Sequence, residues 1–413
     1  SLLAVEWEGH RINVLDAPGY ADFDCEVVEA CVAADAALIT VDAVGGMQAG
    51  VETSWAHADE AGLPRMLLIS RLDRENADFD GLVAALRERF GTKVVPLAVP
   101  DGVARDFTAT IDLLSDAEAA PEAREMLVES VAETNDELLD KYLEGDEISA
   151  DELSAALAVA VAAGDVVPVL PVSAVAEIGV KELMDRIVAL LPSPLGREHA
   201  LEDGSTTTDP SGPLVAHVFK TTADPFVGRL TFLKVLSGTL KADQSPYNVQ
   251  RETTERLGHL FLHRGKEQIE VSELVAGDIG VAAKLSDTLT GDTFVATAAD
   301  AVTVPPLPLP VPTYRSALHP TTKADVDKLS SALQRIQEQD PSIHIDRDPD
   351  THEILMITIG DAQVNVAAQR LAETFGVAVD AVLPLVPYRE TVSATARSEY
   401  KHKKQSGGHG QYG

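Results

Sequence analysis

Short apolar runs alternate with amphipathic stretches through roughly the first 200 residues of the chain. The apolar runs end at Gly, Pro or Asp and fall at 12–15, 37–41, 66–69, 94–99 and 167–172. Between them, apolar positions recur with a helical period, as in 22–34, 50–61 and 79–90. Strands that alternate with helices predict a mostly parallel sheet in an α/β unit.

One part of this first unit lacks any strand signal. Residues 115–163 are acidic, rich in Ala and helical in period, and they stop at Gly164. We therefore expect a helical insert over about 101–165 within a unit that spans 1–200.

Beyond a polar linker at 202–213, the hydrophobic period changes to two. Alternating runs at 214–220, 229–236, 268–271 and 279–284 are separated by turns that contain Gly. Short strands with frequent turns predict a β-barrel over 201–303. The proline-rich run at 304–312 then predicts a stiff spacer.

The pattern changes again in residues 304–388. It predicts a strand, a helix, two strands, a helix and a last strand, at 314–318, 326–336, 343–347, 353–359, 362–375 and 377–383. The order βαββαβ is typical of a ferredoxin-like domain. Residues 389–413 open a fourth unit that is too short to fold alone, so we expect the natural protein to be longer than this chain.

Charge and cysteine content narrow the class of protein. The chain has 33 basic and 66 acidic residues, a net charge of −33, which argues against general affinity for nucleic acid backbones. Segment 101–165 holds 18 acidic and three basic residues, whereas 389–413 is basic. An acidic chain with one basic end suggests different partners at different faces, although the acidic segment also fits a role in solubility alone.

The chain has two cysteines, Cys25 and Cys31, which predict neither a disulfide framework nor a zinc site. No apolar segment is long enough to cross a bilayer, and we expect no signal peptide. We expect a monomer in a reducing, cytoplasmic compartment. His259 and His263 lie four residues apart but have no third metal ligand near them in the sequence.

The run R-I-N-V-L-D-A-P-G-Y at 11–20 predicts a buried apolar strand that ends in an aspartate and a Pro-Gly turn. Ligands of open α/β sheets bind at the carboxyl ends of strands. There, Asp16 suits Mg²⁺ held through water, Pro18 stiffens the turn, and Gly19 allows the backbone to approach a terminal phosphate. By themselves, the same residues also describe an ordinary turn after a strand.

Two further strand ends carry residues that suit a guanine base. The run at 66–69 leads into S-R-L-D at 70–73, and the run at 167–172 leads into Ser173-Ala174. The Asp73 carboxylate suits two hydrogen bonds from guanine, to its N1–H and its exocyclic amine, which adenine cannot offer. Small residues at 173–174 let a backbone N–H reach the guanine carbonyl. Three such loops in this order predict a guanine-nucleotide site.

With these loops in place, the whole chain resembles translation elongation factor G. D-A-P-G-Y is similar to the family's D-T-P-G-H, S-R-L-D to its N-K-x-D, and Ser173-Ala174 to its last guanine loop. Further resemblance lies in T-T-A-D-P-F-V-G-R-L-T-F (221–232), T-K-A-D (322–325), V-P-Y-R-E-T-V (386–392) and K-Q-S-G-G-H-G-Q-Y-G (404–413). These segments are similar to the start of the second domain, to the third domain and to the opening of the fourth.

The resemblance implies a ribosome-bound factor that couples GTP hydrolysis to movement of tRNA and messenger RNA. It implies GTP or GDP and Mg²⁺ as ligands, and ribosomal RNA and stalk proteins as partners, with the acidic insert as the subdomain that meets the stalk. The nucleotide-binding residues would be Asp16, Ala17, Pro18, Gly19, Tyr20, Ser70, Arg71, Leu72, Asp73, Ser173 and Ala174. Asp16 would hold Mg²⁺ through water.

The chain departs from the family at several positions. No G-x-x-x-x-G-K-[ST] motif occurs, so the resemblance implies a P-loop-type GTPase domain without its first strands and P-loop. We expect those residues to precede Ser1, and residues 1–413 alone to bind GTP poorly. In the third domain, 360–363 read G-D-A-Q where the family has G-E-L-H, which weakens the inference about that interface.

Two substitutions fall in the predicted site itself. Tyr20 stands where the family has the histidine that positions the attacking water, and a phenol lacks the donor and acceptor pair of an imidazole. Ser70 and Arg71 replace Asn and Lys in the base loop; serine loses an amide donor, while arginine still suits stacking on the purine. We expect slower hydrolysis and weaker, but still guanine-selective, binding.

Four functions remain open on these grounds. The first is a diverged elongation factor G-like GTPase with impaired hydrolysis, and the second is an ordinary translocase that tolerates Tyr20. The third is a ribosome-binding regulator that uses nucleotide without hydrolysing it. The fourth is a ribosome-protection or release type of relative, which the sequence at 404–413 disfavours.

Overall fold

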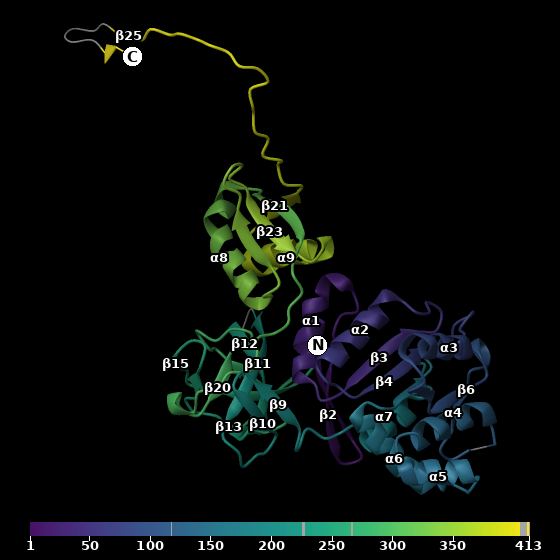
Figure 1. The fold of residues 1–413 in the computed structure, drawn as a ribbon. Coiled ribbons are helices and arrows are strands. Elements are labelled where there is room, and N and C mark those ends of the chain that lie inside the picture. Colours follow the sequence, from purple (N-terminus) through teal and green to yellow (C-terminus); the bar gives the residue numbers. More distant parts are fainter. Residues whose placement is uncertain (117, 225–227, 266, 405–410, 413) are drawn as a thin grey trace.

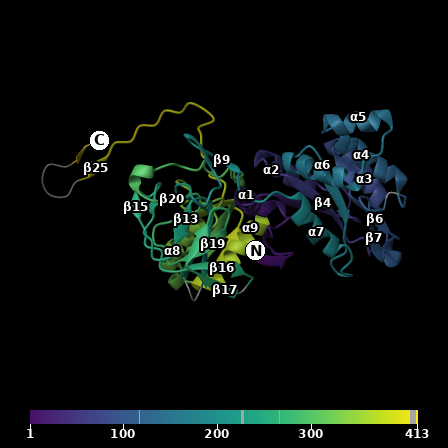
Figure 2. The same cartoon turned by 90° about the horizontal axis from the view of Figure 1, so that it is seen from below.

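The computed structural model describes residues 1–116, 118–224, 228–265, 267–404 and 411–412. They form an α/β unit, a β-barrel and a ferredoxin-like unit (Figure 1). The α/β unit and the barrel lie next to each other, and the ferredoxin-like unit sits over their junction, close to helix α1 (Figures 1 and 2). This architecture confirms the predicted fold class.

A four-stranded parallel sheet forms the centre of the α/β unit. Its strand order is β3-β4-β8-β5, with bounds β3 (Ala37–Asp42), β4 (Arg65–Ser70), β8 (Val167–Pro171) and β5 (Val94–Pro96). The helices of this unit outside the acidic insert are α1 (Asp24–Ala33), α2 (Ala49–Glu60), α3 (Phe79–Phe90) and α7 (Val180–Leu190). Apolar residues of β4 and β8 are buried throughout, as expected for strands covered on both faces.

The strand before the Pro-Gly turn differs from the expectation of a buried sheet strand. β1 (Leu2–Trp7) and β2 (His10–Leu15) form a separate antiparallel hairpin, and the residues of β2 are half-buried or exposed. Strand β3 pairs with β4 on one edge, and no described strand pairs with its other edge. Strand β2 therefore has no neighbour in the sheet, and its residues stay accessible.

The run at 94–99 also differs, because it is two strands rather than one. After β5, the chain turns into β6 (Ala98–Asp101), which pairs antiparallel with β7 (Ala109–Asp112) outside the main sheet. The alternation of the sequence did not reveal this hairpin.

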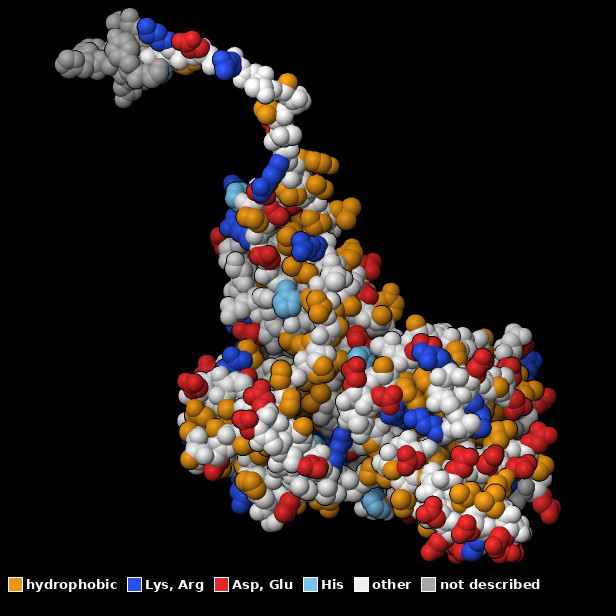
Figure 3. Space-filling view, viewed as in Figure 1, with side chains coloured by type: hydrophobic (Ala, Val, Ile, Leu, Met, Phe, Trp, Pro, Cys, Tyr) orange, Lys and Arg blue, Asp and Glu red, His pale blue; other side chains and the backbone are white. Residues whose placement is uncertain are grey.

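The expectation of a helical insert over about 101–165 holds only for its later part: residues 109–112 form strand β7, and three helices over 121–163 pack on a core rich in leucine, valine and alanine. These are α4 (Pro121–Ala132), α5 (Asp136–Glu144) and α6 (Ala150–Ala163). Ser149 caps α6 in a capping box with Glu152, and Gly164 ends the helix in a left-handed conformation at φ 79°. Figure 3 shows acidic side chains gathered on the face of this region.

The barrel is an eight-stranded antiparallel sheet of order β15-β14-β20-β11-β12-β19-β16-β17 beside a small β13-β18 pair. Its longest strands are β11 (Val215–Asp224) and β12 (Gly228–Ser237). The others are β13 (Thr239–Lys241), β14 (Tyr247–Asn248), β15 (Thr253–Thr254), β16 (Leu260–Arg264), β17 (Glu267–Val271), β18 (Glu273–Val275), β19 (Ile279–Ala283) and β20 (Thr293–Val295). A hairpin of β9 (Glu198–Leu201) and β10 (Gly204–Thr207) precedes them.

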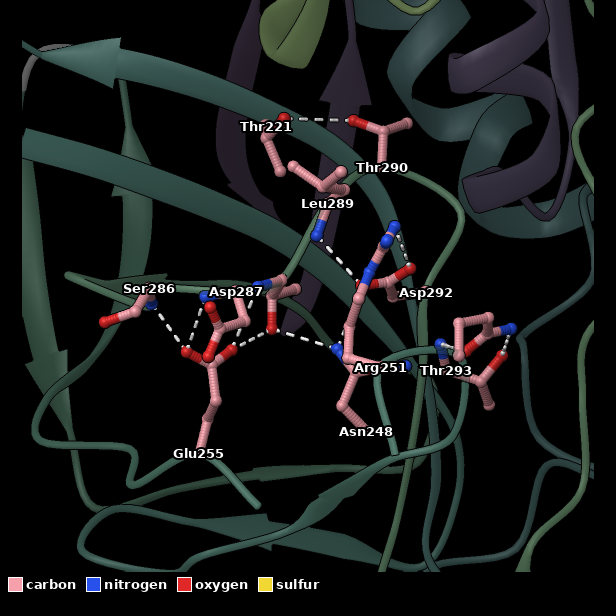
Figure 4. Close-up of polar contacts among 12 residues, drawn as sticks. Thr221, Asn248, Arg251, Glu255, Ser286, Asp287, Leu289, Thr290, Asp292 and Thr293 are labelled. Atoms are coloured by element: carbon pink, nitrogen blue, oxygen red, sulfur yellow. Dashed lines mark hydrogen bonds and ion pairs between the residues drawn. The ribbon is translucent and has the colours of Figure 1, made fainter. Parts of the chain in front are cut away.

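A buried polar network fixes the loop before β20 (Figure 4). The Glu255 carboxylate accepts hydrogen bonds from the backbone N–H groups of residues 286–288. Asp292 accepts from the Asn248 amide at 2.9 Å and from the Arg251 guanidinium at 3.0 Å. Because both carboxylates are buried and fully hydrogen-bonded, the network rigidifies this side of the barrel.

The third unit has the ferredoxin-like topology. Its sheet order is β22-β23-β21-β24, all antiparallel, with bounds β21 (Tyr314–Pro320), β22 (His344–Arg347), β23 (Ile354–Thr358) and β24 (Val379–Val382). Two helices, α8 (Lys323–Gln339) and α9 (Asp361–Phe375), pack on it. A capping box between Thr322 and Asp325 begins α8.

Residues 383–402 form no helix or strand and extend away from the ferredoxin-like unit (Figure 1). Two short strands, β25 (Lys403–Lys404) and β26 (Gln411–Tyr412), follow. Most of the K-Q-S-G-G-H-G-Q-Y-G segment at 404–413 lies outside the described residues. No helix that the structure describes combines the length and hydropathy needed to cross a membrane.

Candidate functional site

The two predicted base loops meet at the carboxyl edge of the parallel sheet. The Ser173 hydroxyl, after β8, donates a hydrogen bond of 2.6 Å to Oδ1 of Asp73, in the loop after β4. The second oxygen of this carboxylate has Arg74 Nε 3.7 Å away as its ion-pair partner. Since Ser173 is fully buried, its hydroxyl holds the carboxylate in one orientation.

The loop that carries Ser173 is closed by its own backbone. Ser173 and Ile178 exchange two backbone hydrogen bonds of 3.0 Å, and the Ser173 hydroxyl also accepts from Ala176 N–H at 3.2 Å. Ala174 is exposed, and among the described residues no hydrogen bond uses its N–H. That N–H is available to an incoming acceptor such as a purine carbonyl.

The first residues of the base loop point to the neighbouring strand. The Ser70 hydroxyl donates to the carbonyl of Val41 at 3.3 Å, and Arg71 Nη1 donates to Asp42 Oδ2 at 2.8 Å. Leu72 is buried in the apolar core and anchors the loop. Arg71 adopts φ 62°, a conformation that non-glycine residues rarely take and that is often found at functional sites.

Asp42 has a second set of partners besides Arg71. Hydrogen bonds from the backbone N–H groups of Val44 and Gly45, together with the Arg71 guanidinium, hold the pKa of the Asp42 carboxyl below its usual range. The bond from Val44 N–H to Oδ1 is 3.0 Å long. The carboxylate therefore stays ionised at neutral pH and links two strand ends.

The turn at Asp16–Tyr20 makes its own hydrogen bonds, separate from those of the base loops. The backbone of Asp16 pairs with Ser1, with Asp16 N–H donating at 2.7 Å, and its side chain is exposed. Ala17 and Pro18 are half-buried, and a Cβ at Gly19 would meet no atom within 4 Å. Within the described residues, no hydrogen bond joins this turn to 70–73 or 173–174.

Tyr20 ends the turn with its side chain in solvent. It is 61% exposed, and its ring centroid lies 6.3 Å from that of Phe23. No hydrogen bond from the described residues fixes its hydroxyl. The residue is thus in a position to meet a ligand or water at the turn.

The acidic groups of the site fit Mg²⁺ only in the manner of nucleotide-bound magnesium. Within the described residues, no group of three His, Cys, Asp or Glu side chains is arranged to hold a metal. Mg²⁺ usually keeps several waters and binds one or two carboxylates plus substrate phosphates. The exposed Asp16 carboxylate suits that arrangement.

The helix that follows the turn is fixed to the barrel by ion pairs. Lys220 on β11 contacts Glu26 and lies 2.7 Å from Glu29 on α1, which is almost completely buried. At the end of α1, Asp35 receives Lys234 at 2.6 Å and Arg197 at 3.3 Å. These ion pairs join α1 and the residues that follow it to the barrel.

The same region also contacts the ferredoxin-like unit. Asp22, in the 3₁₀ turn Ala21–Phe23 before α1, accepts a 2.8 Å hydrogen bond from Ala362 N–H in the first turn of α9. Gln363, which stands where the family has histidine in this segment, is buried. Its side-chain amide donates to Asp340 and to Ser342 at 2.8 Å each. The G-D-A-Q segment thus builds an ordered interface despite its departure from G-E-L-H.

Sequence reasoning missed Asp42, Asp22 and Arg74 as parts of this site. The signal for Asp42 was present, since A-L-I-T-V-D at 37–42 ends an apolar strand in an aspartate as the run to Asp16 does. No sequence signal predicts the contact of Asp22, because its partner is 340 residues away.

Comparisons with known proteins agree along the chain. Residues 1–193 match the family described as Elongation factor Tu GTP binding domain, residues 213–297 match Elongation factor G domain 2, and residues 309–382 match Elongation Factor G, domain III. A relative from Thermotoga maritima, described as an Elongation factor G-like protein, is 36% identical over 99% of this chain and 63% of its own length. A crystal structure of a protein from Thermus thermophilus has a TM-score of 0.84 and 35% identity, over 100% of this chain and 63% of that one. The chain therefore spans less than two thirds of the length of these relatives.

Proposed function

This chain belongs to the elongation factor G family, and on that basis we propose that it is part of a translational GTPase that acts on the ribosome. The observation that best supports this function is the hydrogen bond between Ser173 and Asp73, which fixes a carboxylate at the sheet edge where a guanine base would bind. The proposed ligands are GTP or GDP and Mg²⁺. The proposed partners are ribosomal RNA and stalk proteins, met by a monomer in the cytoplasm.

The roles of the base loops follow from their donors and acceptors. Asp73 accepts from guanine N1–H and the exocyclic amine, and Ser173 keeps its carboxylate turned for that pairing. Ala174 N–H donates to the guanine carbonyl. Adenine presents an acceptor at N1 and has no amine at C2, so it offers the Asp73 carboxylate neither of the two donors that guanine offers and is rejected.

The roles at the turn concern the phosphates. The Gly19 N–H would donate to the terminal phosphate, and Asp16 would hold Mg²⁺ through water; when bound, the metal would neutralise charge on the phosphate oxygens. Tyr20 would be the residue nearest the attacking water, by resemblance to the family's histidine at this position. A phenol offers one hydroxyl and no charge at neutral pH, so it orients water less well than an imidazole. Hydrolysis is therefore weakened, and movement of tRNA and messenger RNA is coupled to it.

The binding claim is tested by calorimetry on the natural protein that contains residues 1–413, with GDP and ADP as ligands. We expect binding of GDP and no measurable binding of ADP. Asp73→Ala removes two charge-assisted hydrogen bonds, so GDP affinity falls by at least about 10²-fold. Equal affinity for GDP and ADP, or an Asp73→Ala variant that binds GDP normally, would exclude the proposed site.

A second candidate is a ribosome-bound regulator that uses GTP without hydrolysing it. The exposed and unbonded Tyr20 side chain favours it, because nothing in the described residues holds the hydroxyl toward a water. Hydrolysis of GTP with and without ribosomes separates the two. Stimulation by ribosomes of many orders of magnitude excludes the regulator, and GTP binding without any stimulation excludes the translocase.

A further inference from the structure

We propose that Asp42 is a positioning residue of the nucleotide site, which holds the guanidinium of Arg71 as a flat platform for the purine. This inference rests on the proposed guanine site and adds to it a residue from a third strand end. Asp42 ends β3, and Arg71 follows β4, its parallel neighbour in the sheet.

The two residues are brought together by strand register. Asp42 pairs with Ser70 in the β3–β4 ladder, so the next residue, Arg71, starts directly beside the Asp42 carboxylate. Arg71 Nη1 donates to Asp42 Oδ2 at 2.8 Å. The other oxygen, Oδ1, accepts from Val44 N–H at 3.0 Å, so the carboxylate is itself held in place.

The position of this pair relative to Asp73 gives it a role toward the base. Arg74 N–H donates to the Arg71 carbonyl at 3.0 Å, which closes a tight turn over 71–74. Arg71 and Asp73 therefore lie on one rim, at the carboxyl edge of the sheet. The Arg71 side chain is 66% exposed, and its ion pair occupies the Nη1 edge, so a face of the guanidinium remains open to a ligand.

An arginine platform acts only when its long side chain is held. The guanidinium stacks on aromatic rings through its planar face, but a free side chain samples many rotamers and must be ordered on binding. Asp42 performs that ordering in advance. Preordering one side chain of this kind changes ligand affinity by roughly threefold to tenfold.

The strained backbone of Arg71 supports the same role. Its φ of 62° lies in the left-handed region that residues other than glycine rarely adopt, and its side chain donates to Asp42 on β3. A residue held in this region persists only when its surroundings determine it, and such residues are concentrated at ligand sites. A contact that served stability alone would contribute little at this exposure.

The experiment uses calorimetry with GDP and IDP on the natural protein that contains residues 1–413. IDP lacks the exocyclic amine that Asp73 recognises but keeps the purine face. Asp42→Asn preserves the acceptor for Val44 N–H and removes the charge that holds Arg71. We expect this variant to bind GDP and IDP three to ten times more weakly, with the ratio of the two affinities unchanged.

Two further variants separate positioning from a general structural effect. Arg71→Ala is expected to weaken both ligands by about tenfold, and adding Asp42→Asn to it should change neither affinity by more than about twofold. Asp243→Asn breaks the Arg256–Asp243 pair, which is 2.9 Å long and even more exposed, away from the site; it should leave both affinities unchanged.

The outcomes distinguish this inference from the proposed function. If Asp42→Asn binds GDP within about twofold of the unmodified protein, or if the two substitutions are additive, Asp42 does not position Arg71. If the GDP-to-IDP ratio changes with Asp42→Asn, the residue acts on Asp73 instead. If the unmodified protein does not prefer GDP to ADP, the guanine site itself is wrong, and this inference fails with it.

Discussion

Replacing Gly360 by alanine tests how the phosphate-side turn is joined to the ferredoxin-like unit. A Cβ at this position would lie 2.3 Å from both carboxylate oxygens of Asp22 and 2.4 Å from its Cγ. The backbone of Gly360 is extended, with φ −160°, so alanine adopts it without strain. The whole effect of Gly360→Ala therefore falls on the contact with Asp22.

The magnitude follows from the contact that is lost. Asp22 must move away, and it then loses its 2.8 Å hydrogen bond to Ala362 N–H. A charged acceptor at a helix N-terminus is worth about 1–2 kcal/mol, from capping together with the helix dipole. A half-buried carboxylate keeps most of that value. The ratio of docked to undocked α9 should thus fall by roughly 5- to 30-fold.

Hydrogen–deuterium exchange measures this ratio at the residue concerned. In Gly360→Ala, the amide of Ala362 should exchange roughly 5 to 30 times faster, together with the first turn of α9. Gly258→Ala is the matched control, because a Cβ there meets no atom within 4 Å. In Gly258→Ala, the amides of α9 should exchange at the same rates as in the unmodified protein.

A double-mutant cycle decides whether the reasoning is right. Once Asp22→Ala has removed the carboxylate, Gly360→Ala should have no further effect on exchange at Ala362. If Gly360→Ala leaves the protection of α9 intact, or if its effect is the same with and without Asp22, the close contact does not dock this unit.

Two buried ionisable groups and the base loops at 70–73 and 173–174 give three more tests. Burial raises the pKa of Glu29 from 4.5 to about 7 despite the nearby Lys220, so between these values the folded protein binds a proton that the unfolded chain releases. The free energy of unfolding therefore falls as pH rises from 4.5 to about 7, by up to about 1.4 kcal/mol per pH unit. Glu29→Gln should flatten this slope in urea titrations at pH 5 and 7. Burial lowers the pKa of His217 from 6.5 to about 4, so the free energy of unfolding falls as pH falls through that range, opposite to the effect of Glu29. His217→Leu should remove this loss of stability, and an unchanged dependence on acid pH in that variant would contradict the prediction. Ser173→Ala frees the Asp73 carboxylate and should weaken GDP binding about three- to tenfold in calorimetry, whereas normal affinity would show that the hydroxyl does not orient the acid.

The fold was predictable because hydrophobic period and turn residues are local signals. The alternation at 214–236 and the order of elements over 314–383 specify the barrel and the ferredoxin-like unit without knowledge of distant contacts. The position of β2 was not predictable in the same way. Its period predicts a strand, but which strand it pairs with depends on residues elsewhere in the chain.

The site shows the same division. The proximity of Asp73 and Ser173 was predictable because strand ends converge at one edge of a parallel sheet, whereas their role toward a nucleotide stays a prediction. The link between Asp42 and Arg71 depends on strand register and on a left-handed backbone, which the sequence pattern does not encode. The contact of Asp22 beside Gly360 joins different units, and only the packed structure reveals it.

The central claim, a guanine-nucleotide switch with weakened hydrolysis, is tested most directly by one comparison. GTP hydrolysis on ribosomes is measured for the natural protein that contains residues 1–413 and for its Tyr20→His variant. Because the imidazole restores a donor and acceptor pair beside the attacking water, we predict ribosome-stimulated turnover that rises at least ~10²-fold in Tyr20→His. Rapid turnover with Tyr20 that the histidine does not increase would contradict the account.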